Sequence, residues 1–431
     1  MKIAIAGYGI EGESNYRYWS ADPQNEVVIV DENQPKCQLP DGVRTIISND
    51  AFSNMQEFDL VVRTAGLAPR KIKTNGKIWS GTNEFFDKCP ALIIGVTGSK
   101  GKSTTVSLIA SILRQAGKKV WLIGNIGKPA LDELTYINKD DYVVFELSSF
   151  QLWDIKKSPQ IAVVLFIEQE HLNVHLDINE YVSAKANITK YQSSDDLLIF
   201  NKSNDYAQSI ADLSSAKLIG YTDEKSAHVT DGNFYYGEQK ICSVDTLKIV
   251  GKHHFDNACA AIDAIWQITN DTEVIKAGLS DFEGLPHRLQ FVREVKGIKY
   301  YDDSIATTPS SSIAAIRSFD GPEVIILGGS SKGSDFTSLG LELTKHDVNA
   351  ILIGDEAETI SKSCLEAGFT NFVIIKNSEM SMMKIVELAQ NMLLDNKNGG
   401  VVLLSPSSAS FGLFKDYADR GDQFATAVRT L

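Results

Sequence analysis

The chain has 431 residues, enough for two or three domains of roughly 150 residues each. Its apolar content of 43% and charged content of 23% are ordinary for a globular protein, while the net charge of −13 argues against a broad surface for nucleic acid or an anionic membrane. The five cysteines are scattered, as is typical of free thiols in a reducing compartment, and no signal peptide or apolar run near the ~18 residues of a membrane helix is found. We therefore expect a cytoplasmic protein without membrane insertion or a nucleic-acid partner.

An N-terminal α/β region is predicted over residues 1–89. The apolar strand 2–6 runs into Gly7-Tyr8-Gly9-Ile10-Glu11-Gly12, a G-x-G-x-x-G turn before a helix, and the next strand ends at Asp31. This pattern favours a nucleotide or diphosphate site, although a purely structural βαβ turn is the alternative. A further strand is predicted at 60–62. About 90 residues is small for a full dinucleotide domain, so a site for one nucleotide fits better.

The stretch Thr97-Gly98-Ser99-Lys100-Gly101-Lys102-Ser103-Thr104 lies between an apolar strand, 91–94, and a helical pattern, 106–113. Strand, glycine-rich turn and helix in this order predict a phosphate-binding loop, because glycines let the backbone approach an anion and the helix N-terminus adds partial positive charge. The spacing is a compact form of the common motif. Lys102 can reach the terminal phosphates of a nucleotide, and the Ser103 hydroxyl can ligate Mg²⁺.

The central region, residues 90–285, carries further polar side chains just after its apolar strands. Strand 142–145 is followed directly by Glu146, and ligands gather at the C-terminal ends of strands in open α/β sheets. Glu146 can therefore share a magnesium ion with the phosphate loop. His171 follows the next strand, and Lys185 lies in a predicted helix. From spacing alone, a satisfied turn histidine and a solvated lysine are the more common roles.

The second half of the chain is predicted to add a small insertion and a third α/β unit. Residues 215–250, including 217–219, are predicted to form short antiparallel strands. Asn257 lies one turn into the alanine-rich helix that follows, where an ordinary helix start is as good an interpretation as a functional contact. The motif Gly284-Leu285-Pro286-His287-Arg288 predicts a boundary. Strands then alternate with helices, which predicts a doubly wound unit over 286–431.

Taken together, these features resemble the Mur ligase family nearly from end to end. The segments that carry the resemblance are Thr97–Thr104, Gly124-Asn125-Ile126-Gly127, Glu146-Leu147-Ser148-Ser149-Phe150-Gln151-Leu152, Glu170-His171-Leu172 with Lys185, Gly284–Arg288, Asp302-Asp303-Ser304, Leu404-Ser405-Pro406 and Phe414-Lys415-Asp416-Tyr417-Ala418-Asp419-Arg420-Gly421-Asp422. The resemblance implies an α/β protein of three domains. These are a Rossmann-like domain for a UDP-linked substrate over 1–89, a P-loop ATPase-type domain with a mostly parallel sheet over 90–285, and a Rossmann-like domain for an amino acid over 286–431.

The resemblance also implies an activity, ATP-driven amide formation through an acyl phosphate. The implied substrates are those of the branch that adds D-glutamate to UDP-N-acetylmuramoyl-L-alanine in peptidoglycan precursor synthesis, with ATP and two Mg²⁺ ions, Mn²⁺ being able to replace them, in a monomer. Alternatives are a family member that adds another amino acid, such as L-glutamate, a ligase like folylpolyglutamate synthase, and a non-catalytic nucleotide-binding protein. The N-terminal glycine turn speaks against the folate enzymes, which lack such a domain.

The family's functional residues carry over to positions of this chain by motif. The resemblance implies ATP contacts at Gly98, Ser99, Lys100, Gly101, Lys102, Ser103, Thr104, Asn257, Arg288 and Asp303. It implies metal ligands at Ser103, Glu146, His171 and Lys185, with Lys185 carbamylated to N6-carboxylysine, and catalytic roles for Lys102, His171 and Lys185. It implies contacts to the UDP substrate at Gly9, Ile10, Glu11, Asp31, Thr64, Gly66 and Asn125, and to the amino acid at Thr307, Lys332, Ser410, Phe411 and Tyr417.

The chain departs from the family pattern at several of these places. Where the family usually has Asn-Asp-Ser-Lys-Ala-Thr-Asn, this chain has Asp302-Asp303-Ser304-Ile305-Ala306-Thr307-Thr308, without the lysine. His254 and Phe166 stand where asparagine is usual, and Glu170 stands where aspartate is usual. These differences leave the ligase chemistry in place and bear on which amino acid is joined, and on its handedness.

Overall fold

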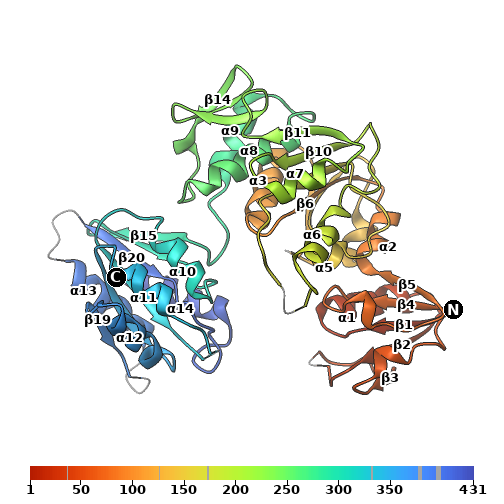
Figure 1. Ribbon diagram of the computed structural model, residues 1–431, viewed down its shortest axis with the longest axis horizontal. Helices are drawn as coiled ribbons and strands as arrows, with labels where there is room; N and C mark the ends of the chain where they lie inside the picture. Colours follow the sequence, from red (N-terminus) through yellow and green to blue (C-terminus); the bar gives the residue numbers. More distant parts are fainter. Residues whose placement is uncertain (36, 126, 172–173, 332, 377–380, 395–398) are drawn as a thin grey trace. The chain divides into compact units, whose positions relative to one another are not determined.

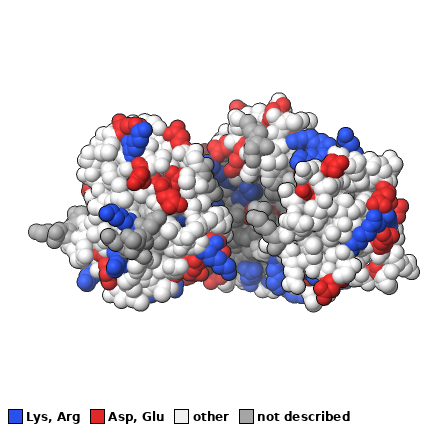
Figure 2. Space-filling model, turned by 90° about the horizontal axis from the view of Figure 1, so that it is seen from below, with Lys and Arg blue, Asp and Glu red and all other residues white. Residues whose placement is uncertain are grey.

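The computed structural model describes residues 1–35, 37–125, 127–171, 174–331, 333–376, 381–394 and 399–431. The chain divides into two compact units. The first comprises 1–247 with 252–282, and the second comprises 248–251 with 283–431. No described helix combines the length and the apolar character that crossing a bilayer requires. On the face drawn in Figure 2, basic and acidic side chains are interspersed in small groups.

The first sheet of the first unit has five parallel strands in the order β3-β2-β1-β4-β5 (Figure 1). The elements in this region are β1 (Lys2–Ala6), α1 (Ile10–Ser20), β2 (Glu26–Asp31), β3 (Arg44–Ile47), β4 (Leu60–Arg63), β5 (Lys77–Ser80) and α2 (Gly81–Lys88). Alternate residues of β1 pack on opposite faces, because successive strand side chains point in opposite directions. Ala4 and Ala6 lie in one apolar cluster with Phe52 and Phe58, whereas Ile3 belongs to the cluster on the other face.

The second sheet has six parallel strands in the order β11-β10-β9-β6-β8-β7. Its strands are β6 (Leu92–Thr97), β7 (Val120–Gly124), β8 (Tyr142–Glu146), β9 (Ile161–Val164), β10 (Leu197–Asn201) and β11 (Lys217–Tyr221). β11 pairs in parallel with β10, from Leu197 opposite Lys217 to Asn201 opposite Tyr221. The prediction that 217–219 belongs to an antiparallel insertion was therefore wrong. The side chains of Lys217 and Leu218 are exposed, so the apolar signal of a central strand is missing at this sheet edge.

The remaining elements of the first unit are helices and a separate three-stranded sheet. They are α3 (Lys102–Gln115), α4 (Ala130–Glu133), α5 (Ser149–Leu152), α6 (Ile178–Ala186), α7 (Asp205–Ala211), α8 (His253–Ile265) and α9 (Thr272–Asp281), with the antiparallel strands β12 (Ala227–Thr230), β13 (Asn233–Tyr236) and β14 (Gln239–Ser243). The predicted small antiparallel insertion is thus confirmed for its last three strands. α9 packs directly on α3, and a Cβ at Gly278 would lie 2.4 Å from the Ile112 Cα.

The second unit is built on a six-stranded sheet in the order β15-β16-β20-β17-β18-β19, in which only β15 is antiparallel to its neighbour. Its elements are β15 (Gln290–Val295), β16 (Ile298–Asp302), α10 (Pro309–Ile316), β17 (Glu323–Gly328), α11 (Thr337–Leu343), β18 (Val348–Ile353), α12 (Ala357–Glu366), β19 (Phe372–Ile374), α13 (Met382–Leu393), β20 (Gly400–Leu404) and α14 (Tyr417–Thr430). One apolar cluster joins α13 and α14 to the sheet, and another joins α10, α11 and α12 to its opposite face (Figure 1). The predicted α/β class, with a mostly parallel P-loop-type central sheet, is confirmed. The domain boundaries at 89/90 and 285/286 stay predictions.

Candidate active site

The phosphate loop predicted between β6 and α3 has the backbone that its glycines allow. Gly98 and Gly101 have φ values of +154° and +85°, and α3 begins at the next residue, Lys102. A Cβ at Gly101 would lie 2.3 Å from Asn257 Oδ1, and one at Gly98 would lie 2.7 Å from the Leu165 Cβ. Asn257 of α8, predicted as an ATP contact, is therefore packed directly against the loop. The loop, the helix N-terminus and this amide form one small polar site.

Two lysines meet at the carbonyl of Gly98. Lys102 Nζ donates to Gly98 O at 2.9 Å and to Ser99 O at 2.8 Å. Lys185 Nζ, from the last turn of α6, donates to the same Gly98 O at 2.9 Å and approaches Thr97 Oγ1 at 3.4 Å. Lys185 is only 1% exposed, so the interpretation of it as a solvated surface lysine does not apply. Two like charges at one carbonyl are unfavourable unless an anion joins them or one amine is neutral.

Burial and charge repulsion act on Lys185 in the same direction. Desolvation, followed by the nearby Lys102 charge, holds the pKa of the Lys185 ammonium well below its usual range, and Glu170 opposes this only in part. The Lys185 Nζ also lies 4.5 Å from the centroid of the Tyr181 ring. Burial beside a like charge thus shifts this side chain from the ammonium toward the neutral, nucleophilic amine.

The other side chains of the loop are held by the segment after β9. Ser99 Oγ donates to Glu168 O at 2.8 Å and lies 2.9 Å from Tyr181 Oη, which itself donates to Glu170 Oε2 at 3.3 Å. Lys100 forms an exposed ion pair with Glu168 at 2.5 Å. Glu170, a departure from the family's usual aspartate, thus contacts the phosphate loop through Tyr181. Of the remaining loop residues, Thr104 is buried and Ser103 is partly exposed.

Glu146 has the property expected of a metal ligand. It is 1% exposed at the C-terminal end of β8, and Asn125 Nδ2 donates to its Oε1 at 3.0 Å. Its Oε2 is buried and has no hydrogen-bond partner among the described residues. A buried carboxylate oxygen left without a donor fits a hard divalent cation. No group of three His, Cys, Asp or Glu among the described residues could hold a metal by itself, so hydroxyl, carbamate or phosphate oxygens would have to complete such a site.

The ring of His171 is exposed and lies close to Phe150 and Tyr181. His171 has a left-handed φ of +58°, and its side chain is 46% exposed. Its Nε2 lies 3.9 Å from Glu170 Oε2, and its ring packs 5.0 Å from Phe150 and 6.3 Å from Tyr181, centroid to centroid. Lys185 packs against the same Tyr181 ring. The structure therefore brings His171 and Lys185 to one aromatic side chain, although no direct contact joins them.

The residues predicted to hold the UDP substrate lie around the glycine turn of the first sheet. Asp31 Oδ2 accepts from the Tyr8 amide at 2.9 Å, and Glu11 Oε2 accepts from the Ala65 amide at 2.8 Å. A Cβ at Gly7 would lie 2.3 Å from Thr64 Oγ1, so this glycine lets two turns meet. Gly9, Ile10 and Gly66 lie at the exposed edge of the same turns, Ile10 with 72% of its surface accessible. Asn125 lies apart from them, at Glu146.

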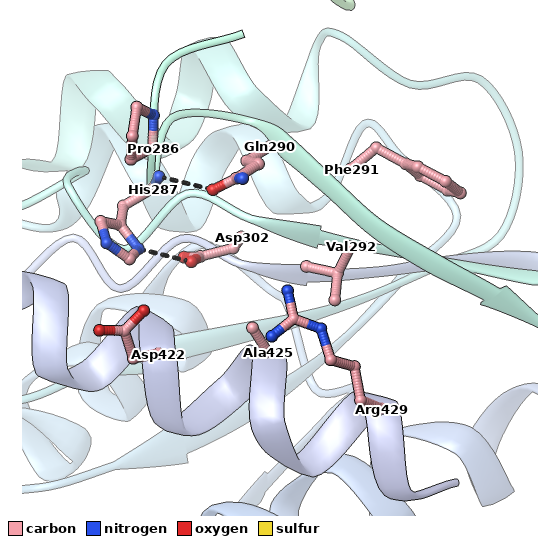
Figure 3. A pocket seen from close by; sticks show the side chains of 9 residues that line it. All are labelled: Pro286, His287, Gln290, Phe291, Val292, Asp302, Asp422, Ala425 and Arg429. Carbon is pink, nitrogen blue, oxygen red and sulfur yellow. Dashed lines mark hydrogen bonds and ion pairs between the residues drawn. The ribbon is translucent and has the colours of Figure 1, made fainter. Parts of the chain in front are cut away.

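In the second unit, Arg288 and Asp303 are neighbours. Leu289 N donates to Asp303 Oδ1 at 3.1 Å and Ser405 Oγ donates to Oδ2 at 2.7 Å. Burial raises the pKa of Asp303 to about 7, against these hydrogen bonds and the nearby Arg288 charge. His287 Nδ1 lies 2.7 Å from Asp302 Oδ2 beside a small pocket that Asp422 and Arg429 also line (Figure 3).

The residues predicted to bind the amino acid have different environments. Ser410 is buried, its carbonyl accepting from the Phe414 amide at 3.0 Å, and Thr307 is partly exposed. The side chains of Phe411 and Tyr417 are 63% and 42% exposed. The Tyr417 ring lies 6.1 Å from that of His287. Lys332 lies outside the described residues.

Two arginines that the sequence analysis did not assign are fully buried at these places. Arg420 donates to Ser304 Oγ at 2.9 Å, to Ser304 O at 2.8 Å and to Ser408 O at 3.1 Å, and burial lowers its pKa to about 10. Arg63 ends β4 beside the predicted substrate turn. The sequence did contain a sign of the role of Arg63. It is a charged residue at the end of an apolar run, and a strand of a parallel sheet is buried on both faces.

Comparisons with known proteins identify the family of this chain. A profile described as the Mur ligase middle domain matches residues 96–265, and one described as the Mur ligase, glutamate ligase domain, matches residues 287–408. The UDP-N-acetylmuramoylalanine--D-glutamate ligase of Clostridium tetani is 35% identical, covering 100% of this chain and 97% of the relative. The protein of that name from Acetivibrio thermocellus is 34% identical, covering 100% and 96%.

Among solved structures, MurF from Acinetobacter baumannii matches with a TM-score of 0.63 at 17% identity, covering 99% of this chain and 93% of that chain. At this identity the match bears on the fold alone. The full-length similarity to the two relatives and the two matching domain profiles lead to one conclusion. The chain belongs to the Mur ligase family.

Proposed function

We propose that this protein is the ATP-dependent ligase that joins D-glutamate to UDP-N-acetylmuramoyl-L-alanine in peptidoglycan precursor synthesis. The observation that carries the proposal is the similarity to relatives with this printed activity, at 32% to 35% identity over most or all of the chain. The phosphate loop with its two lysines and the unpaired oxygen of Glu146 supplies the chemistry that such an activity needs. We also propose a cytoplasmic monomer, which five free cysteines suit.

ATP would bind with its terminal phosphates in the loop between β6 and α3. The backbone amides at the start of α3 and the Lys102 ammonium are the donors available for phosphate oxygens. Lys102 now donates to the carbonyls of Gly98 and Ser99, so it would exchange these contacts for phosphate oxygens. Gly98, Ser99, Lys100, Gly101, Ser103, Thr104 and Asn257 are the further ATP contacts proposed in this unit, with Arg288 and Asp303 in the other.

Lys185 is proposed to react with carbon dioxide. Its neutral amine attacks the carbon of CO₂, a C–N bond forms, and the nitrogen loses one proton, which leaves an N6-carboxylate. This step places a negative charge beside the Lys102 ammonium, so the two side chains that meet at the Gly98 carbonyl become an ion pair. The carbamate oxygens, His171, Glu146 and the Ser103 hydroxyl are donors that suit two magnesium ions. When bound, Mg²⁺ supplies charge neutralisation at the phosphates.

The proposed reaction has two steps. A carboxylate oxygen of the alanyl group attacks the γ-phosphorus of ATP, and the bond from that phosphorus to the β–γ bridging oxygen breaks. ADP departs, and the alanyl carboxylate has become an acyl phosphate. The amine of D-glutamate then attacks the acyl carbon, the C–O bond to phosphate breaks, and the nitrogen gives up a proton to yield the amide and inorganic phosphate. The work of the chain in both steps is positioning and electrostatic stabilisation, with Lys102 and Lys185 at the phosphates.

The other two substrates have proposed sites of their own. The UDP part would lie at Gly9, Ile10, Glu11, Asp31, Thr64 and Gly66, with Asn125 near the sugar. The amino acid would contact Thr307, Lys332, Ser410, Phe411 and Tyr417. A cation and hydroxyl groups suit an amino acid with two carboxylates.

The test is phosphate release from ATP with UDP-N-acetylmuramoyl-L-alanine, Mg²⁺ and single amino acids. We expect turnover with D-glutamate and little with L-glutamate. Turnover with a different amino acid would overturn the assigned specificity. Turnover with a folate acceptor in place of the UDP-sugar would point to the folylpolyglutamate reaction, and no turnover with any acceptor, despite ATP binding, would overturn the enzyme assignment.

A further inference from the structure

Arg63, the last residue of β4, is fully buried, and together with Arg420 it is the largest of the fully buried side chains of the described residues. An arginine is always charged, and burying a charge is unfavourable unless it is paired and hydrogen-bonded. The neighbouring strand residues Val61 and Val62 are apolar and equally buried. A residue of this cost at the end of a core strand calls for a specific role.

The guanidinium joins the N-terminal region to the segment that follows Glu146. Its Nε donates to Asp154 Oδ2 at 2.8 Å, and its Nη2 pairs with Asp154 Oδ1. Nη2 also donates to Phe150 O, in α5, at 2.9 Å. The pair is bidentate, a geometry that fixes orientation as well as distance. Asp154 retains 18% side-chain exposure, so the fork is anchored at the edge of the core.

The other side of the same guanidinium holds the turn predicted to bind the UDP substrate. Nη1 donates to the carbonyls of Thr64, Ala65 and Leu67 at 3.3, 3.3 and 3.2 Å. In a trans peptide the N–H points opposite to the C=O of the same unit. Holding the Ala65 carbonyl inward therefore turns the amide of Gly66 away from Arg63, toward the exposed side of the turn. An outward amide in a turn is a donor for phosphate or carbonyl oxygens.

A line of contacts continues from Arg63 toward the proposed metal site. Phe150, whose carbonyl accepts from Arg63, packs its ring 5.0 Å from His171 and stacks on His175 at 5.3 Å. His175 Nε2 in turn lies 2.9 Å from Ser149 Oγ. One buried side chain thus contacts the substrate turn directly and the histidine-bearing loop through a single residue.

We propose that Arg63 is a positioning residue that orients the turn 64–67 for the UDP-linked substrate and fixes it relative to the loop that bears His171. This inference rests on the proposed function, because it takes the UDP substrate to bind at that turn. Arg63 itself touches no reacting atom. It acts through the carbonyls of the turn on one side and through Phe150 on the other.

A second arginine in the same unit provides a matched control. Arg17 of α1 also joins the first sheet's region to the central one, with its Nη2 2.7 Å from Asp132 Oδ2. Its side chain is 49% exposed, and it donates to no carbonyl of the substrate turn. If Arg63 served only to hold the two regions together, replacing either arginine would change stability and leave substrate binding by the folded protein unchanged.

The experiment compares wild type, Arg63→Met, Arg63→Lys and Arg17→Met in the full chain. Circular dichroism gives the folded fraction, and calorimetry gives the Kd for UDP-N-acetylmuramoyl-L-alanine without ATP and for Mg²⁺-ADP. Steady-state assays give kcat and the KM for each substrate. Arg63→Lys keeps a charge for Asp154 but cannot reach four carbonyls and a carboxylate together, so it remains informative if Arg63→Met does not fold.

We expect both Arg63 variants to bind the UDP substrate about tenfold or more weakly, because a turn that is no longer held in place loses hydrogen bonds to the substrate. Binding of Mg²⁺-ADP should be unchanged. In the Arg63 variants the KM for the UDP substrate should rise while the KM for ATP stays unchanged. Arg17→Met should have the same Kd and KM for the UDP substrate as wild type. If Arg63→Lys binds the UDP substrate as tightly as an active wild type, the inference is overturned and the proposed function stands. A wild type that does not bind UDP-N-acetylmuramoyl-L-alanine would overturn the proposed function and the inference with it.

Discussion

Gly101 lies so close to Asn257 that the substitution Gly101→Ala, which adds one methyl group, tests the structure of the phosphate loop. Gly101 has a φ of +85°, and a Cβ there would lie 2.3 Å from Asn257 Oδ1 and 3.1 Å from its Cγ. Alanine at such a φ costs about 1–2 kcal/mol in backbone energy. The contact is far below van der Waals distance, so the Asn257 side chain must also move, which costs about 1–3 kcal/mol in a packed site.

These two costs can be separated by a double-mutant cycle. Gly101→Ala should lower the free energy of unfolding by about 2–5 kcal/mol, the sum of the two terms. In the background of Asn257→Ala the steric part is gone, so the same change should cost only the backbone part. The double variant should therefore be more stable than the sum of the two single changes predicts, by a coupling energy of about 1–3 kcal/mol. Gly117→Ala is the matched control, because φ there is +71° and nothing lies within 4 Å of its Cβ.

The assay is urea unfolding followed by tryptophan fluorescence, with calorimetric ATP binding for each variant. Gly117→Ala should lose only the backbone part and bind ATP like wild type. Gly101→Ala should bind ATP more weakly, because the displaced Asn257 amide no longer faces the loop. Additive effects of Gly101→Ala and Asn257→Ala on stability would refute the steric argument. Normal ATP binding by Gly101→Ala would refute the assignment of this loop to phosphate.

Three further predictions concern ionisable groups. Lys102→Ala should abolish the formation of the acyl phosphate, a loss of several kcal/mol of transition-state stabilisation, and near-normal phosphate release would contradict this. Lys185→Ala should lose activity that added short carboxylates restore in part, whereas a fully active variant would exclude the carbamate role. Asp263, whose Oδ2 has no partner among the described residues, has its pKa raised by burial to about 8 from 3.8. Between these pH values the folded protein holds a proton that the unfolded chain releases, so stability should fall as pH rises, by at most about 1.4 kcal/mol per unit. Urea unfolding of Asp263→Asn at pH 6 and pH 8 should show a flatter dependence than wild type, and an equal slope would disprove the assignment.

Much of the fold could be predicted because its strands are buried on both faces. β1 and β8 read as continuous apolar runs, and each was expected within one residue of its observed bounds, whereas β6 ends three residues beyond the predicted strand 91–94. β11 was misassigned because its side chains at the sheet edge are exposed, and β15, with alternating burial, was not predicted. Edge strands have exposed side chains, so they lack the continuous apolar run from which the central strands were predicted.

The candidate site divides in the same way between chain and fold. The phosphate loop and Glu146 follow from local order, because a strand, a glycine turn and a helix N-terminus are consecutive in the chain. No local pattern distinguishes Lys185 from a solvated helix lysine, nor Arg63 from a strand-ending surface residue. What lowers the pKa of Lys185 is its burial beside Lys102, eighty-three residues earlier in the sequence. What makes Arg63 a positioning residue is a set of carbonyls and a carboxylate on two separate segments. Desolvation and long-range hydrogen bonding arise only when distant segments pack together, so the tertiary structure alone decided the chemical roles of these two side chains.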